Sequence, residues 1–182
     1  MNIYEILKED HRHVEDLFAQ IEEALEDHEH GQLPALFNEL KTELTAHAKA
    51  EQEVFYEPLK VMSRSEEGEE LSWEGEEEHH VVFLLLNELS RIPLDSEQWA
   101  AKIKVLSEIV DHHVEEEEGE IFSEARKVFS DDDARLMADS LEDLKEIYKG
   151  MVDDALAEDV AIFNNPLTST GARSQRSDYL AG

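Results

Sequence analysis

Two segments of the chain carry the same pattern, in which a histidine is followed four residues later by a glutamate. The pairs are His47 with Glu51 and His113 with Glu117. On an α-helix, residues four apart lie on one face, and here each pair interrupts an apolar stripe. A protein core does not accept an imidazole and a carboxylate unless something satisfies them. The repeated pattern therefore predicts long helices packed around a buried metal site.

Apolar residues recur at helical spacing along almost the whole chain, and no stretch alternates for long with the period of a strand. This spacing predicts four core helices, at about 2–27, 33–62, 72–91 and 97–129. A polar turn at 28–31, an acidic linker at 63–71 and a proline-containing break at 92–96 connect them. Short connections between long amphipathic helices make neighbours antiparallel. We therefore expect an all-α fold, with an up-down-up-down four-helix bundle at 1–129.

The sequence after residue 129 predicts an additional C-terminal helix. Ser130 and the three aspartates that follow it form a good N-cap and first turn. We expect this accessory helix to span 130–163, within the same domain, and to pack outside the four core helices. Its inward side chains are expected to be Leu141, Leu144, Tyr148, Met151 and Ala155. The chain then becomes polar and loses its period, so 164–182 is expected to be a mobile, disordered tail.

Composition narrows the classes of function. The 182 residues include no cysteine, which excludes disulfides and thiolate sites, so any metal is held by nitrogen and oxygen. The 46 acidic and 16 basic residues give a net charge of −30, which disfavours nucleic acid and membrane surfaces as partners. The N-terminus has no signal-peptide pattern, and the longest apolar run, 81–86, is too short to cross a bilayer. We expect a cytoplasmic protein.

Each core helix places one histidine on its inward stripe. Residues three, four, seven and ten positions away are mostly apolar for His11, His47, His79 and His113. The same count places His80 and His112 on the flanks, and His13, His28 and His30 in solvent. Four imidazoles and two carboxylates are too many ligands for one zinc ion. They suit two metal ions, with Glu51 and Glu117 placed to bridge them.

The residues around these histidines resemble the motifs of the hemerythrin-like, HHE cation-binding family. The matching segments, over roughly 3–129, are Glu9-Asp10-His11, His47 through Glu51 to Phe55-Tyr56, Glu78-His79, and His112-His113 through Glu117 to Ile121-Phe122. The resemblance implies a non-haem di-iron centre, with two iron ions joined by an oxo or hydroxo bridge. It also implies that dioxygen, peroxide or nitric oxide is bound or sensed. Carried over by position, the metal ligands are His11, His47, Glu51, His79, His113 and Glu117.

The chain departs from the oxygen-carrying members of that family on the third helix. Those proteins place two histidines four residues apart there, whereas the positions four before and four after His79 are Gly75 and Phe83. Glu76, three before His79, and Glu15, four after His11, are additional ligand candidates. If a water molecule takes the ligand position of the absent histidine instead, the site is more open to peroxide and less suited to reversible oxygen carriage.

Three functions remain open from the sequence. The first is a di-iron protein that binds or senses dioxygen, peroxide or nitric oxide, and sensing would need a protein partner at the C-terminal helix or tail. The second is a di-iron enzyme that decomposes hydrogen peroxide or reduces nitric oxide. The third is a structural or storage protein for iron or zinc. Manganese also suits the same ligands, since a set of histidines and carboxylates does not rank these metals by itself.

Overall fold

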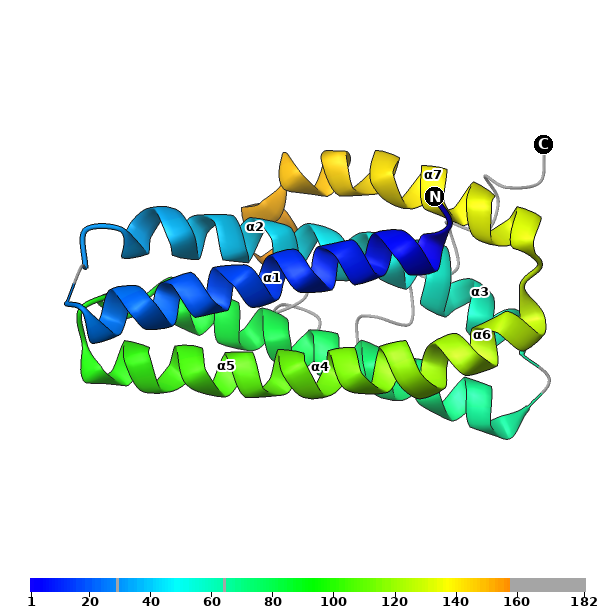
Figure 1. Cartoon of the computed structure of the whole chain (residues 1–182), viewed down its shortest axis with the longest axis horizontal. Helices are drawn as coiled ribbons and strands as arrows, with labels where there is room; N and C mark the ends of the chain where they lie inside the picture. The colour runs from blue at the N-terminus through cyan, green and yellow to red at the C-terminus, as the bar shows by residue number, and fades with distance from the viewer. Residues whose placement is uncertain (29, 64, 158–182) are drawn as a thin grey trace.

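Four long helical rods run side by side along the long axis of the molecule (Figure 1). The computed structural model describes residues 1–28, 30–63 and 65–157, and every regular element in those ranges is helical. The first and third rods are α1 (Ile3–Glu26) and α4 (Glu66–Leu89). The second rod is α2 (Leu33–Glu51), continued by η1 (Gln52–Tyr56) and α3 (Glu57–Met62). The fourth is α5 (Glu97–Glu116), continued by η2 (Glu117–Ile121) and α6 (Phe122–Val128).

Consecutive rods run in opposite directions, which confirms the predicted up-down-up-down bundle (Figure 1). The additional helix α7 (Asp131–Lys149) lies outside the bundle and packs along α1 and α2. Short polar side chains define where the helices begin. Asn2 forms a capping box with Glu5, and Ser130 forms one with Asp133. Among the described residues, no helix has both the length and the apolar character that a bilayer crossing requires.

The acidic stretch predicted as a linker at 63–71 belongs mostly to α4, so this prediction was wrong from residue 66 onward. The side chain of Ser65 caps the helix by accepting a hydrogen bond of 3.1 Å from the backbone N–H of Gly68. Three glutamates then occupy the first turn, where the helix dipole favours negative charge. The acidic residues that suggested a solvated loop therefore stabilise a helix N-terminus.

The fifth helix is shorter than predicted, because α7 ends at Lys149. Gly150 is a poor helix former and, with Met151, makes a turn before helical conformation resumes at 152–157. The turn directs Val152 and Leu156 into the core of the bundle and leaves Met151 exposed, contrary to the prediction for Met151. The predicted continuation of this helix to 163 and the predicted tail at 164–182 lie outside the described residues.

Two wide helical turns interrupt the second and fourth rods at equivalent places. The π-helical segment η1 begins directly after Glu51, and η2 begins at Glu117, so each starts where one of the two repeated motifs ends. Such turns are rare and often occur at functional sites. The extra residue in each turn rotates the following helix, so that Phe55 with Tyr56, and Ile121 with Phe122, are all buried.

A polar layer divides the apolar core into two clusters. One cluster lies toward the α1–α2 and α4–α5 turns and includes Leu17, Ile21, Phe37, Leu86 and Trp99. The other lies toward α3, α6 and α7 and includes Ile3, Leu7, Phe55, Phe122 and Leu141. On α1, His11 stands between Leu7 of the second cluster and Val14 of the first. The bundle therefore holds its buried polar groups at one level, with apolar packing on both sides.

Candidate metal centre

The six side chains predicted as ligands come together in the polar layer and form two groups of three. One group is His11, His47 and Glu117, and the other is Glu51, His79 and His113. All six side chains are buried, and both glutamates are fully inaccessible to solvent. Within each group, one possible ligand atom from every residue lies within 4.8 Å of the other two. The structure thus brings two imidazoles and one carboxylate to each of two neighbouring positions.

Each glutamate belongs to the group opposite the histidine of its own helix, so both carboxylates lie between the groups. Glu51 Oε2 is 3.5 Å from His47 Nε2 on the same helix and 3.4 Å from His79 Nε2. Glu117 Oε2 is 3.9 Å from His113 Nε2 on the same helix and 3.0 Å from His11 Nε2. The i,i+4 spacing of the repeated motif therefore places each carboxylate within reach of both groups.

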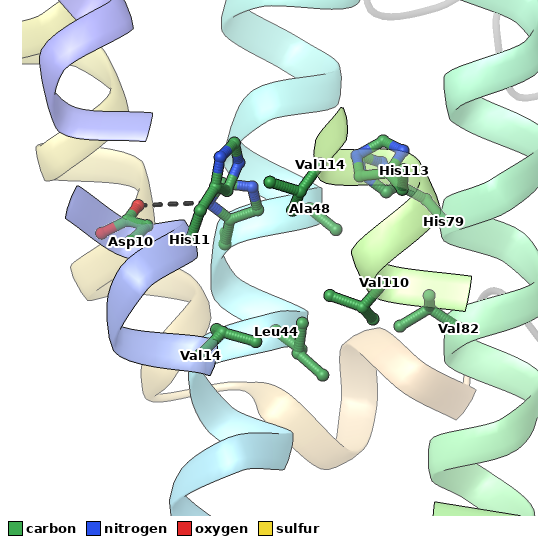
Figure 2. A pocket seen from close by; sticks show the side chains of 11 residues that line it. Asp10, His11, Val14, Leu44, Ala48, His79, Val82, Val110, His113 and Val114 are labelled. Carbon is green, nitrogen blue, oxygen red and sulfur yellow. Dashed lines mark hydrogen bonds and ion pairs between the residues drawn. The ribbon is translucent and has the colours of Figure 1, made fainter. Parts of the chain in front are cut away.

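Carboxylates outside the two groups orient three of the four imidazoles. Asp10 accepts from Nδ1 of His47 at 3.1 Å, and the bond is drawn as a dashed line in Figure 2. Glu78 accepts from Nδ1 of His113 at 2.8 Å, and Glu118 accepts from Nδ1 of His11 at 2.9 Å. A histidine that donates from Nδ1 to a carboxylate presents the lone pair of Nε2, which is the usual arrangement of a metal-binding histidine.

The contacts between Nε2 atoms and carboxylate oxygens need a metal ion or a proton between the two atoms. With Nδ1 protonated, the lone pairs of His11 Nε2 and Glu117 Oε2 face each other at 3.0 Å. The Nε2 atoms of His79 and His113 are also 3.0 Å apart, and in the metal-free protein His79 can donate a hydrogen bond across this distance because its Nδ1 has no partner among the described residues. Metal–ligand bonds of about 2.1 Å at right angles put neighbouring ligand atoms about 3.0 Å apart. The residues present therefore fit metal ions at these two positions.

In the metal-free protein, protons supply part of this missing positive charge. Burial raises the pKa of Glu51 well above its ordinary value, and the charge of Glu117 adds to the rise. Burial also opposes ionisation of Glu117, but hydrogen bonds with Glu51 and His11 outweigh it and lower the pKa of Glu117. Burial alone would lower the pKa of His11, yet its bonds to Glu117 and Glu118 raise it. Metal binding must displace the protons that Glu51 and His11 retain.

Two of the imidazoles are already in the form that binds metal. Burial lowers the pKa of His47, although Asp10 opposes the shift, and burial lowers the pKa of His79 well below its ordinary value. For Asp10 the desolvation that raises its pKa is outweighed by His47 and Lys145, which bring the pKa down to about 2. An ionised Asp10 beside a neutral His47 keeps the Nε2 lone pair available.

A small apolar cavity adjoins the imidazoles. Its volume is about 20 Å³, which is room for one or two small atoms. All four site histidines line it, together with Asp10 and the apolar side chains of Val14, Leu44, Ala48, Val82, Val110 and Val114. Figure 2 shows Val14, Leu44, Val82 and Val110 together on one side of the histidine rings. A small, weakly polar molecule fits this space better than water does, because the walls are mostly apolar.

The place of the absent third-helix histidine is taken up by Tyr56. A Cβ atom at Gly75 would lie 2.7 Å from the Tyr56 hydroxyl oxygen, so only glycine leaves room for the ring there. Tyr56 is fully buried, and its ring centroid is 5.6 Å from that of His79. Its hydroxyl has no hydrogen-bond partner among the described residues. Burial, and then the charges of Glu117 and Glu51, raise the pKa of Tyr56 well above its ordinary value, so the phenol is neutral.

The two additional ligand candidates lie outside both groups. Glu15 is exposed on α1. Glu76 is buried but accepts a hydrogen bond from the ammonium group of Lys60. Neither side chain is brought to the positions between the imidazoles.

The remaining histidines mostly lie where the sequence predicted. His80 is half-buried and the side chain of His112 is exposed, whereas both His79 and His113 are buried. His13 and His28 are exposed as predicted, but His30 is half-buried. His112 also lies near Glu78 and Glu116, in a solvent-facing group. The buried centre therefore uses one histidine from each rod.

Sequence reasoning assigned no hydrogen-bond partner to the outer carboxylates and no contact with Gly75 to Tyr56, which it took as part of the core wall. Two of these carboxylates carry a detectable signal, because Asp10 directly precedes His11 and Glu78 directly precedes His79. In each case the acid bonds the histidine of the next rod, His47 or His113, and not its own neighbour. The repeat therefore extends to an acidic residue before each lone histidine.

Fold and centre together define a helical-bundle protein with a buried cation site lined by histidine and carboxylate. The family model described as Hemerythrin HHE cation binding domain matches residues 2–125, and the chain belongs to this family. A solved structure of a hemerythrin HHE cation binding domain-containing protein from Mycobacterium kansasii is similar, with a TM-score of 0.68 and 25% sequence identity. That likeness covers 87% of this chain and 99% of the mycobacterial chain.

A curated relative from Nostoc sp. (strain PCC 7120 / SAG 25.82 / UTEX 2576) is described as a DNA nickase. It is 29% identical over 130 residues, which cover 71% of this chain. The match spans only 35% of the length of the nickase. The likeness therefore concerns about a third of that protein.

Proposed function

We propose that this chain holds two iron ions in the buried centre and binds a small molecule beside them, namely dioxygen, peroxide or nitric oxide. The observation that carries the proposal is the division of six buried ligands into two groups of two imidazoles and one carboxylate. Two histidines and one carboxylate, with positions left open, are typical of non-haem iron(II) sites. Bound iron would supply electrons to such a small molecule. Zinc and manganese suit the same donors, so the test below begins with the metal.

The protein's own residues would perform three tasks. His11, His47, His79 and His113 would hold the ions through Nε2, and Glu51 and Glu117 would bridge them. The outer carboxylates Asp10, Glu78 and Glu118 fix the direction of three of these rings. The apolar cavity beside the imidazoles admits a molecule of one or two heavy atoms and disfavours water.

Decomposition of hydrogen peroxide is a second candidate, and Tyr56 is the observation that favours it. Its neutral phenol is buried beside His79, and the O–H has no partner among the described residues. Such a group would hold a proton close to the centre, where peroxide chemistry needs one. Each group of three ligands also leaves positions at which peroxide could bind.

We do not extend DNA nicking from the relative to this chain. The net charge of −30 repels the phosphate backbone, from which most non-specific affinity for DNA arises. The shared segment is about a third of the relative, so the nicking activity of that protein need not lie in the shared segment.

The deciding experiment combines metal analysis with optical spectroscopy of the purified protein. We expect two iron ions per chain after anaerobic loading, and new visible absorption after addition of dioxygen, peroxide or nitric oxide. Steady evolution of dioxygen from peroxide would favour the enzyme. A colourless protein that holds only zinc and does not respond to these molecules would overturn the proposal.

A further inference from the structure

We propose that Lys145, on the accessory helix α7, is a positioning residue for the metal group formed by His11, His47 and Glu117. It acts through Asp10, which holds His47. The inference rests on the metal binding proposed above and adds a role for a helix outside the matched range 2–125. It also predicts that the two metal positions differ in how firmly they are held.

Lys145 is buried to an unusual degree for a lysine. Only 9% of its surface is exposed, although it lies on a helix that packs on the outside of the bundle. Lysine is almost never buried unless its charge is paired. Its ammonium group donates to Oδ1 of Asp10 on α1. The pairing joins α7 to the helix that supplies His11.

The other oxygen of the same carboxylate faces the centre. Asp10 Oδ2 accepts from His47 Nδ1 at 3.1 Å, so the carboxylate is held from both sides, by α7 and by α2. Without the ammonium group, a mostly buried Asp10 loses its cationic partner, and turning toward solvent becomes favourable. That movement would release Nδ1 of His47 and, with it, the direction of the Nε2 lone pair. Residues that orient metal-binding histidines in this way strongly affect metal affinity.

In the second metal group, formed by Glu51, His79 and His113, the carboxylate that orients a histidine has a different partner. Glu78 holds Nδ1 of His113, as Asp10 holds that of His47. The other oxygen of Glu78 lies 3.8 Å from Nε2 of His112, whose side chain is 62% exposed. An exposed imidazole therefore stands where the first group has a buried ammonium. Loss of Lys145 should thus loosen one metal position and spare the other.

α7 itself offers a matched control, because it makes further polar contacts with the bundle. Lys149, one turn after Lys145, pairs with Glu43 of α2 at 2.8 Å. Glu43 is in neither metal group and is none of the carboxylates that orient their histidines. Lys149→Met therefore removes a lysine and an inter-helix ion pair from the same helix without removing a hydrogen bond to a carboxylate that orients a site histidine.

The test is metal release from the full chain loaded with Zn²⁺ and mixed with a chromophoric chelator. In Lys145→Met we expect one of the two ions to leave about tenfold faster or more, while the other leaves at the wild-type rate. Glu78→Gln should accelerate the other ion instead. Lys149→Met should behave like the wild type, and Lys145→Arg should restore slow release because it retains the charge.

Thermal unfolding of the metal-free variants checks that they fold, and Lys145→Gln replaces the methionine variant if the latter does not. The inference is overturned if Lys145→Met and Lys149→Met release zinc alike, or if both ions leave faster by the same factor. A wild-type chain that binds neither zinc nor iron would overturn the proposed function itself, and with it this inference. The two failures are distinguishable because only the second affects the unmodified protein.

Discussion

The ring of Tyr56 occupies the space beside Gly75, one helical turn before His79. A Cβ on Gly75 would stand 2.7 Å from the hydroxyl oxygen and 2.8 Å from Cζ of the tyrosine. Since Tyr56 is fully buried, its ring has no free space into which to retreat. The absence of a second histidine on the third rod and the position of this tyrosine are therefore one structural feature.

Gly75→Ala should destabilise the protein by about 1–3 kcal/mol, because it overpacks a filled core. Chemical denaturation of the metal-free protein measures the effect. In a Tyr56→Leu background the cost should shrink, since the ring that meets the new methyl group is gone. Gly119→Ala is the matched control, because nothing lies within 4 Å of a Cβ added there. Equal effects of the two alanines would contradict the assigned contact.

Glu51→Gln and Glu117→Gln should each lower metal content from two ions to one or none per chain. Each removes a fully buried charged ligand that lies between the two groups. Elemental analysis after loading and desalting measures the loss. His13→Gln is the control, because His13 belongs to neither metal group. Its side chain is half-exposed and lies 3.5 Å from that of an exposed glutamate, Glu39. Full metal content in both glutamine variants would show that the ligands are wrongly assigned.

The bundle and its layer of inward histidines could be predicted because both depend on helical periodicity. Counting by three, four and seven residues separated His79 from His80 and His113 from His112, and the burial of these side chains agrees with that count. The boundaries of the helices were predicted less accurately. The start of α4 was misplaced because its acidic first turn has the composition of a linker, and the end of α7 because Gly150 was not weighed as a stop.

The contacts that hold the site histidines from outside the two metal groups could not be predicted from the residue pattern of one helix alone. Asp10 and Lys145 are 135 residues apart in sequence, and their pairing depends on how α7 packs against α1. The contact of Tyr56 with Gly75 depends on the rotation that η1 introduces after Glu51, and no residue pattern marked that turn. Sequence periodicity thus predicts which side chains face inward, whereas packing between rods decides what each one touches.

Metal binding at neutral pH should release protons, and the affinity for metal should rise with pH. The pKa values of Glu51 and His11 are raised in the metal-free protein, so both groups retain protons that a metal ion displaces. His47 and His79, whose pKa values are lowered, have none to release. Titration calorimetry in buffers of different ionisation enthalpy counts the protons.

The same count in His11→Gln should fall, whereas His79→Gln should leave it unchanged for each ion that still binds. Affinity that rises as the pH falls, or no proton release in the wild type, would contradict these assignments. The sign follows from the direction of the shifts: groups that bind protons in the free protein compete with the metal, and this competition weakens as the pH rises.

Filling the apolar cavity should impair small-molecule binding without loss of metal. Ala48 is buried and lines the cavity, so Ala48→Val adds two methyl groups where only about 20 Å³ is accessible. We expect nitric oxide to bind to the iron-loaded variant about tenfold more weakly, as is usual when a small pocket rejects added bulk.

Val82→Ala enlarges the same cavity and should speed binding, at a cost of about 2 kcal/mol in stability from two lost buried methyl groups. Val105→Ala makes the same chemical change at an exposed position and serves as the control. Stopped-flow spectroscopy of nitric oxide binding, with iron content measured on the same samples, separates access from metal loss. Unchanged binding in both cavity variants would contradict the proposal that the small molecule binds in this cavity.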